Sequence, residues 1–249
     1  MSINCPQITV ITICYNAESV IKETMLSVIN QAYSNIEYIV IDGKSSDNTL
    51  AIVYDVKKQS DRKIVVISEK DNGIYDAINK GARLATGEWI NCMNAGDCFA
   101  SNTVLSDIVD SGLMNTASFI YSDFIAKSGN KQRLVHQSYD EGKILHQSVI
   151  YKRILHDKYG LYYVTHPYTV SDYLFFLQVP KDCYAKFNTP ISINDTSGVS
   201  MQGVWMSYGR ICADFMMRKT SERVFLWRII ICAFKCFYIR VLRLLGLRK

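Results

Sequence analysis

The chain has 249 residues, of which 49% are hydrophobic and 20% charged, so it can bury a large core and is not a disordered protein. Its net charge is +5, but this charge is unevenly distributed. Residues 203–249 contain ten basic and two acidic side chains, a net +8, whereas residues 1–202 contain 18 basic and 21 acidic side chains, a net −3. The basic end of the chain therefore predicts an anionic partner.

The cysteines and the first residues bear on the cellular compartment. The eight cysteines are scattered, without the paired spacing of a zinc site or of a small disulfide framework. Residues 1–6 have neither the basic nor the apolar region of a signal peptide. We therefore expect reduced thiols and a cytoplasmic protein.

Short apolar runs alternate with helical patterns in the first hundred residues. Strands are expected at residues 8–14, 36–41, 64–68 and 88–93, and helices at 18–31, through the fifties and at 74–85. Strands that alternate with helices in this way predict a parallel sheet with right-handed crossovers. The second half is less regular. We expect a strand pair at 119–126 and 131–137, a strand at 145–151, a short helix at 170–178 and further strand at 183–193.

Polar turns follow the first three predicted strands. These turns are Tyr15-Asn16, Asp42-Gly43 and Asp71-Asn72-Gly73. In an open α/β sheet, ligands bind at the carboxyl ends of the strands, where carboxylates can accept hydrogen bonds from ribose hydroxyls or a base N–H. The alternative is that Asp and Gly only terminate the strands. Neither a GxGxxG nor a P-loop motif is present, which argues against ordinary dinucleotide and NTPase sites.

The fourth predicted strand runs into a turn with a carboxylate at its tip, residues 94–97 (NAGD). A divalent cation that bridges phosphates takes one or two carboxylates from a protein. Asp97 is therefore the candidate ligand for Mg²⁺ or Mn²⁺. Because the turn offers a single carboxylate, we expect the metal to be held loosely.

Four blocks of this region carry a family resemblance. They are residues 12–16 (TICYN), 39–49 (IVIDGKSSDNT), 69–81 (EKDNGIYDAINKG) and 85–97 (ATGEWINCMNAGD). In this order the chain resembles the family-2 glycosyltransferases, enzymes of GT-A fold that build bacterial surface polysaccharides. The resemblance is close over residues 8–98, looser over 119–178, and ends at about residue 200. It implies an α/β fold with a mixed sheet flanked by helices.

The resemblance assigns roles to the residues at the strand ends. Asp42 and Asp71 would hold the base and ribose of a nucleotide-sugar, with Tyr15 and Gly73 lining the pocket. Asp76, at helical spacing after Gly73, either faces the sugar or belongs to a capped amphipathic helix.

The metal element and the second half complete the expected site. Asp97 would be the last acid of the family's Asp-x-Asp element. The first acid of this element is replaced here. Asn94 lies near the replaced position and is assigned to the nucleotide-sugar site. Direct displacement at an anomeric carbon needs a base. Residues 170–176 (VSDYLFF) resemble the family's base-bearing segment, which makes Asp172 the candidate base, against the alternative of a helix-capping carboxylate. Residues 145–148 (LHQS) resemble a segment that is frequent in these enzymes. The resemblance implies that His146 lies near the acceptor or the diphosphate. The alternative is a buried core histidine.

The expected domain covers residues 1–205, with a nucleotide-binding half at about 1–98 and an acceptor half at about 99–205, and a tail follows at 206–249. On a helical projection of the tail, Arg228, Lys235, Arg240 and Arg243 fall on one side and Phe234, Phe237, Tyr238, Val241, Leu244 and Leu245 on the other. No apolar run reaches the roughly 20 residues of a spanning helix. A basic amphipathic helix lies in a membrane interface. The alternatives are a helix docked on the domain and a dimer contact.

Together these features predict transfer of a sugar from a nucleotide-sugar, most plausibly a UDP-sugar, to a lipid-linked oligosaccharide of a bacterial surface polysaccharide. The resemblance implies inversion by a single displacement. The tail implies a peripheral position on the inner face of the cell membrane, and it lacks a recognisable nucleic-acid module. Two alternatives stay open: a catalytically silent nucleotide-sugar-binding scaffold at the membrane, and a sugar nucleotidyltransferase, whose glycine-rich basic loop is missing at residues 14–19.

Overall fold

The computed structural model describes residues 5–165, 170–196 and 205–244. Its main sheet has seven strands in the order β10-β6-β9-β4-β1-β2-β3. They are β1 (Ile8–Cys14), β2 (Ile36–Asp42), β3 (Ile64–Ser68), β4 (Trp89–Cys92), β6 (Phe119–Ser122), β9 (Val149–Lys152) and β10 (Tyr184–Phe187). The strands β3, β2, β1 and β4 are parallel, whereas β9 is antiparallel to β4 and β6. The predicted parallel sheet of the first half is confirmed.

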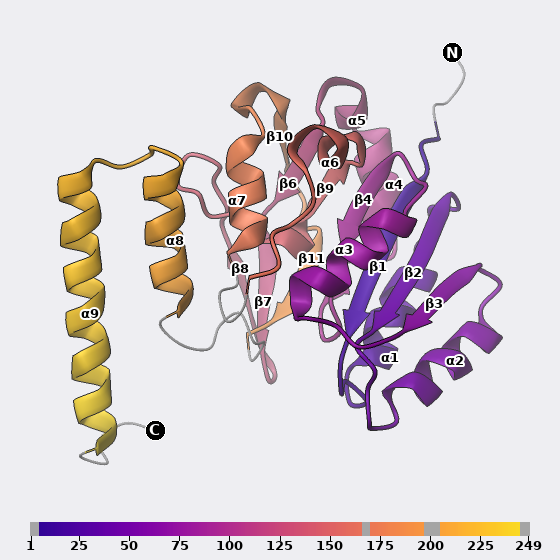
Figure 1. The fold of residues 1–249 in the computed structure, drawn as a ribbon. Helices are drawn as coiled ribbons and strands as arrows, with labels where there is room; N and C mark the ends of the chain where they lie inside the picture. Colours follow the sequence, from indigo (N-terminus) through magenta and orange to yellow (C-terminus); the bar gives the residue numbers. More distant parts are fainter. Residues whose placement is uncertain (1–4, 166–169, 197–204, 245–249) are drawn as a thin grey trace.

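Helices cover both faces of this sheet (Figure 1). Towards one face, Ile8 and Val10 of β1 pack in the same core as α1 (Ile21–Ile29) and α2 (Thr49–Gln59). Towards the other, Ile11 and Ile13 pack with α3 (Ile74–Leu84). Every residue of β1 is buried, as expected for a strand covered on both sides. The approach of α3 to the sheet is close, because a Cβ at Gly81 would overlap the Ile11 side chain.

The second half differs from its predicted outline. Between β4 and the basic tail the helices are α4 (Val104–Asp110), α5 (Leu113–Thr116), α6 (Ile154–Tyr159) and α7 (Ser171–Gln178), with 3-10 turns at His146–Ser148 and Lys181–Cys183. A smaller sheet has the order β5-β11-β7-β8. Its strands are β5 (Cys98–Phe99), β11 (Ser192–Asp195), β7 (Phe124–Ser128) and β8 (Lys131–Val135). The helix α7 and the strand β8 follow the expected ranges closely, and β7 pairs with β8 across the expected turn.

The strand expected at residues 119–126 is divided in two, because the chain changes sheet at Asp123. Residues before it form β6 of the main sheet, and residues after it form β7 of the smaller one. The Asp123 carboxylate accepts hydrogen bonds from the Gln137 backbone N–H at 2.9 Å and from Lys186 Nζ at 2.6 Å. These contacts fix the chain at the joint between the sheets. The expected strand at 183–193 is likewise divided between β10 and β11.

The basic tail forms a hairpin of two helices, α8 (Trp205–Met216) and α9 (Glu222–Leu244). Figure 1 shows α8 between α7 and α9. Arg228, from the basic side of the projection, pairs with Asp214 of α8 at 2.7 Å, so at this point the basic side of α9 packs on α8. The side chains of Arg243 and Leu244, and all of Leu245, lie outside the described residues. Within the described ranges, no helix has the length and apolar character needed to cross a bilayer, and all eight cysteines are free.

Candidate active site

The carboxyl ends of β1 to β3 meet at the edge of the sheet where the strand order reverses. In the order β3-β2-β1-β4, the chain turns from one side of β1 to the other, and such switch points form ligand crevices. A Cβ at Gly43 would lie 2.9 Å from Asp71 Oδ2 and 3.3 Å from the Tyr15 ring. The turns after β1 and β2 and the loop after β3 are therefore in contact, with the Tyr15 ring 66% exposed beside them.

Asp42 holds the turn after β2. Its side chain is fully buried. One carboxylate oxygen accepts from Ser68 Oγ at 2.6 Å, and both accept from the Ser45 backbone N–H. Ser45 Oγ adds a further hydrogen bond at 2.5 Å. The structure thus places Asp42 next to the predicted nucleotide residues, with its hydrogen-bonding capacity used to hold the turn after β2.

Asp71 lies in a group of carboxylates around Lys80. The Lys80 ammonium is 2.6 Å from Asp71 Oδ1, 3.0 Å from Glu69 Oε1 and 3.7 Å from Asp76 Oδ2. Burial raises the pKa of the Asp71 carboxyl, and the Lys80 contact offsets part of that rise. Asp76 also accepts the Asn72 backbone N–H at 2.9 Å, which is the contact expected of the helix-capping alternative. Gly73 begins α3 with a φ of 105°, a conformation that favours glycine.

A second group of residues surrounds Asp172 in the first turn of α7. The Tyr75 hydroxyl donates to Asp172 Oδ1 at 2.8 Å, and His146 Nδ1 lies 3.6 Å from Oδ2. His146 Nε2 is 3.2 Å from Asn94 Nδ2. With the Asn94 amide as donor, the ring proton of His146 lies on Nδ1 and faces Asp172. Three residues predicted from separate segments, Asp172, His146 and Asn94, are therefore linked.

The surroundings of Asp172 favour its ionised form. Burial alone would raise the pKa of this carboxyl, but the contacts with His146 and Tyr75 outweigh burial and lower the pKa below its ordinary value. A carboxyl with a lowered pKa is charged at neutral pH. Such a carboxylate can accept a proton from a hydroxyl that is placed against it. Asp172 is also a first-turn carboxylate, as the alternative predicted, and its oxygens contact Tyr75 and His146.

Asp97 lies at the other end of this linked group. Its Oδ2 accepts from Gln147 Nε2 at 2.7 Å, and its Oδ1 accepts from the Asp195 backbone N–H at 3.1 Å. Burial raises the pKa of the Asp97 carboxyl to about 6, although both hydrogen bonds act against that rise.

The residues around Asp97 fit a cation that is shared with a ligand. In the described part of the chain, no three or more His, Cys, Asp or Glu side chains cluster into a metal cage. However, the buried oxygens Asn94 Oδ1 and Gln147 Oε1 have no hydrogen-bond partner. Mg²⁺ keeps several waters and is bound by one or two carboxylates together with phosphates. One carboxylate with neighbouring amide oxygens is compatible with that kind of site.

A comparison with protein families shows to which family the chain belongs. The model of glycosyl transferase family 2 matches residues 9–169. The chain belongs to this family. A glycosyltransferase of Haemophilus influenzae, described as uncharacterized, is 41% identical over 95 residues, which are 38% of this chain and 29% of the relative. A PGL/p-HBAD biosynthesis glycosyltransferase of Mycobacterium bovis is 28% identical over 126 residues, 50% of this chain and 49% of the relative. The family 2 chain thus spans half or less of the curated relatives it matches.

Solved structures agree with the fold of this family 2 chain. S. aureus TarS 1–349, in complex with UDP-GlcNAc, has a TM-score of 0.70 at 16% identity. The match covers 85% of this chain and 65% of the TarS chain. The mannosyltransferase PcManGT from Pyrobaculum calidifontis, in complex with GDP-Man and Mn²⁺, has a TM-score of 0.68 at 18% identity. This match covers 87% of the chain and 65% of PcManGT. The predicted GT-A fold is confirmed.

Sequence reasoning missed two side chains of the candidate site. Tyr75 contacts Asp172 across 97 positions, and Gln147 contacts Asp97 across 50. Both lie within segments that carry the family resemblance, directly beside Asp76 and His146. Their neighbours could have drawn attention to them, but no sequence pattern gives the partner of a buried hydroxyl or amide.

Proposed function

We propose that the chain is an inverting glycosyltransferase that uses a nucleotide-sugar, with Asp172 as the base. The observation that carries the proposal is the Asp172 carboxylate, in contact with Tyr75 and His146 and connected through Asn94 to the turn after β4. A displacement reaction needs a carboxylate that can accept the proton of the attacking hydroxyl. Membership of family 2 supports the reaction class.

The proposed reaction is a single displacement. The nucleoside part of the donor lies in the crevice at Tyr15 and Asp71, on the turn that Asp42 holds. An acceptor hydroxyl attacks the anomeric carbon from the side of Asp172, and its proton passes to the Asp172 carboxylate. The bond from the anomeric carbon to the diphosphate breaks, and the nucleoside diphosphate leaves with the electron pair. A Mg²⁺ or Mn²⁺ ion at Asp97, when bound, neutralises charge on the diphosphate.

The donor and acceptor classes rest on the relatives. TarS was solved with UDP-GlcNAc, and a poly-beta-1,6-N-acetyl-D-glucosamine synthase of Staphylococcus epidermidis is 37% identical over 94 residues, 38% of this chain and 21% of that protein. These likenesses support a UDP-sugar donor and a role in a bacterial surface polysaccharide. We propose a lipid-linked oligosaccharide as the acceptor.

The outer side of α9 supports a place at a membrane surface. Its exposed apolar residues are Val224, Leu226, Trp227, Ile230, Phe234, Phe237 and Tyr238. Arg223, Lys235 and Arg240 are exposed on the same helix. Aromatic and aliphatic side chains with flanking cations are typical of helices that lie flat on anionic lipid. We propose that α9 holds the protein on the inner face of the cell membrane, near its acceptor.

Replacing part of this face should release the protein from lipid. We expect Trp227→Ser combined with Phe234→Ser to lower partitioning onto anionic vesicles by about tenfold or more, because two large side chains no longer enter the interface. Vesicle co-sedimentation measures the effect. Leu134→Ser on β8, where the leucine is 51% exposed, is the matched control and should bind like the wild type. Equal binding of all three proteins would contradict the membrane assignment.

Lys80 should matter for donor affinity. We expect Lys80→Met to raise the donor KM about tenfold with little change in kcat, because Asp71 loses its cation and stands beside two other carboxylates. Steady-state kinetics measure KM and kcat, and titration calorimetry measures the affinity for UDP. Lys70→Met, a change of the exposed lysine nearby, serves as the control. An unchanged donor KM in Lys80→Met would remove Asp71 from the donor site.

The proposed activity is tested with a panel of nucleotide-sugars, Mn²⁺ and a lipid extract as acceptor. Release of UDP or GDP that depends on the acceptor is the expected result. Binding of a nucleotide-sugar without turnover would favour the scaffold alternative. Pyrophosphate released from a nucleoside triphosphate and a sugar phosphate would favour the nucleotidyltransferase.

A further inference from the structure

The residue after Asp172 is tied to the helical hairpin. The Tyr173 hydroxyl, on α7, donates to Asp214 Oδ1 at 2.5 Å. The other oxygen of Asp214 accepts from Arg228 Nη1 of α9 at 2.7 Å. The Asp214 side chain is only 15% exposed, so water screens these contacts poorly. One carboxylate on α8 therefore holds both the helix that carries the candidate base and the outer helix α9.

Packing around Tyr173 makes this connection stiff. The Arg210 guanidinium lies over the Tyr173 ring, 4.6 Å from its centroid, and donates to the Gly142 carbonyl. A Cβ at Gly209 would lie 3.2 Å from Val170, the residue that precedes α7. The α8 backbone thus rests against the start of α7, one to two residues from Asp172.

The hairpin itself is held by more than the ion pair. Phe215 of α8 stacks on Phe225 of α9 with ring centroids 4.3 Å apart. Cys232 of α9 is buried. Burial and the contact with Asp214 raise the pKa of Tyr173 to about 12, so its hydroxyl remains a donor throughout the physiological range.

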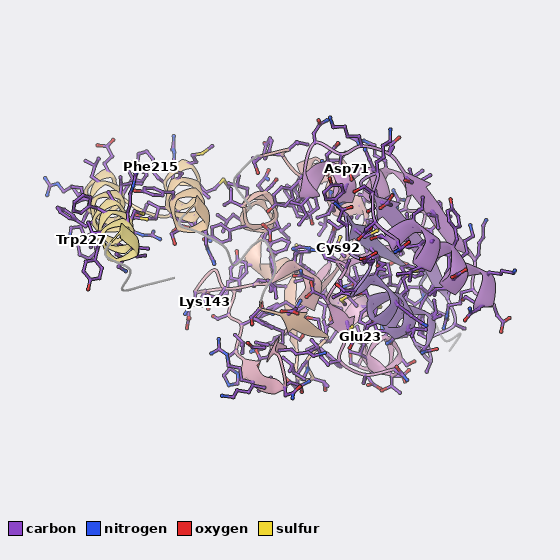
Figure 2. The ribbon with its side chains drawn as sticks, turned by 90° about the horizontal axis from the view of Figure 1, so that it is seen from below. Glu23, Asp71, Cys92, Lys143, Phe215 and Trp227 are labelled. Atoms are coloured by element: carbon purple, nitrogen blue, oxygen red, sulfur yellow. The ribbon has the colours of Figure 1, made fainter. Side chains whose placement is uncertain are left out.

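We propose that Asp214 is a positioning residue for Asp172, through Tyr173 and Arg228, and that the docked hairpin sets the place of the base. This inference rests on the proposed function of Asp172. It gives the tail a part in turnover that is separate from its exposed outer face, where Trp227 lies at the edge of the molecule (Figure 2). The donor crevice is not part of this link, since Asp71 lies on the main body, away from Phe215 and Trp227 (Figure 2).

Kinetics of four variants test the proposal on the full chain. We expect Tyr173→Phe and Arg228→Gln each to lower kcat about tenfold while the donor KM stays within about twofold, because only the base is displaced. Arg228→Lys, which keeps a cation near Asp214, should recover at least part of the loss. Glu222→Gln removes an exposed charge of the same helix and should match the wild type. A wild-type kcat in both Tyr173→Phe and Arg228→Gln, or an equal loss in Glu222→Gln, would overturn the proposal.

Hydrogen exchange separates this proposal from the proposed function. We expect the backbone amides of residues 171–178 to exchange about tenfold faster in Tyr173→Phe and Arg228→Gln than in the wild type and Glu222→Gln. Unchanged exchange in both variants would show that Asp214 does not hold α7, whatever the activity. Faster exchange in a protein that transfers no sugar with any donor would instead overturn the assignment of Asp172 as a base, and the positioning role with it.

Discussion

Asp172→Asn is expected to lower kcat by about a thousandfold, the largest loss of any single substitution considered. General-base catalysis contributes about 10²–10⁴ to the rate, and an amide cannot take the proton of the acceptor hydroxyl. The change preserves size, and its oxygen can still accept from the Tyr75 hydroxyl 2.8 Å away. Steady-state transfer assays with the donor found in the panel measure the effect.

The control for this variant separates chemistry from folding. UDP affinity, measured by calorimetry, should stay within about threefold of the wild type because Asp172 lies outside the nucleotide crevice. Asp157→Asn removes an exposed carboxylate from α6 and should leave both kcat and affinity unchanged. If Asp172→Asn transfers sugar within tenfold of the wild-type rate, another group is the base.

Asp97→Asn is expected to have the second-largest effect, a loss of about a hundredfold in kcat/KM together with the loss of any response to Mn²⁺. The amide can accept one of the hydrogen bonds now donated by Gln147 and the Asp195 backbone. It cannot supply the negative charge that a divalent cation requires. Transfer rates measured with added Mn²⁺ and with a chelator give the result.

Two comparisons make the Asp97 experiment decisive. A chelator should slow the wild type and have no further effect on Asp97→Asn. Asp110→Asn, at the exposed end of α4, should keep the full metal response, and thermal unfolding of Asp97→Asn should show a stability change of only about 1 kcal/mol. A full Mn²⁺ response in Asp97→Asn would place the metal elsewhere.

The parallel half of the fold is readable from the sequence because its signals are local. The run Ile8–Cys14 is buried throughout and reads as a strand without knowledge of its neighbours. The turns after β1, β2 and β3 follow from the strand ends, and parallel strands bring their carboxyl ends to one edge. The meeting of Tyr15 and Asp71 at Gly43 is a direct result of that geometry.

The rest of the site depends on contacts between distant segments. The change of sheet at Asp123 is set by Gln137 and Lys186, and no periodicity reveals it. Asp97 reads as an exposed tip in the sequence, yet its oxygens meet the Asp195 backbone 98 positions away. Arg228 falls on the basic side of the helical projection, but a projection cannot show that this side packs on another helix. The positions of these three side chains depend on burial and on partners distant in the sequence more than on residue type.

The helix α3 joins two parts of the site in one rigid body. Tyr75 at its start holds Asp172, and Lys80 in its second turn holds Asp71. Residues on one short helix move together, since the rise per residue is fixed at about 1.5 Å. The helix also packs closely on β1, because a Cβ at Gly81 would overlap the Ile11 side chain. One helix, fixed against the sheet, therefore supplies contacts to both the candidate donor residue Asp71 and the candidate base Asp172.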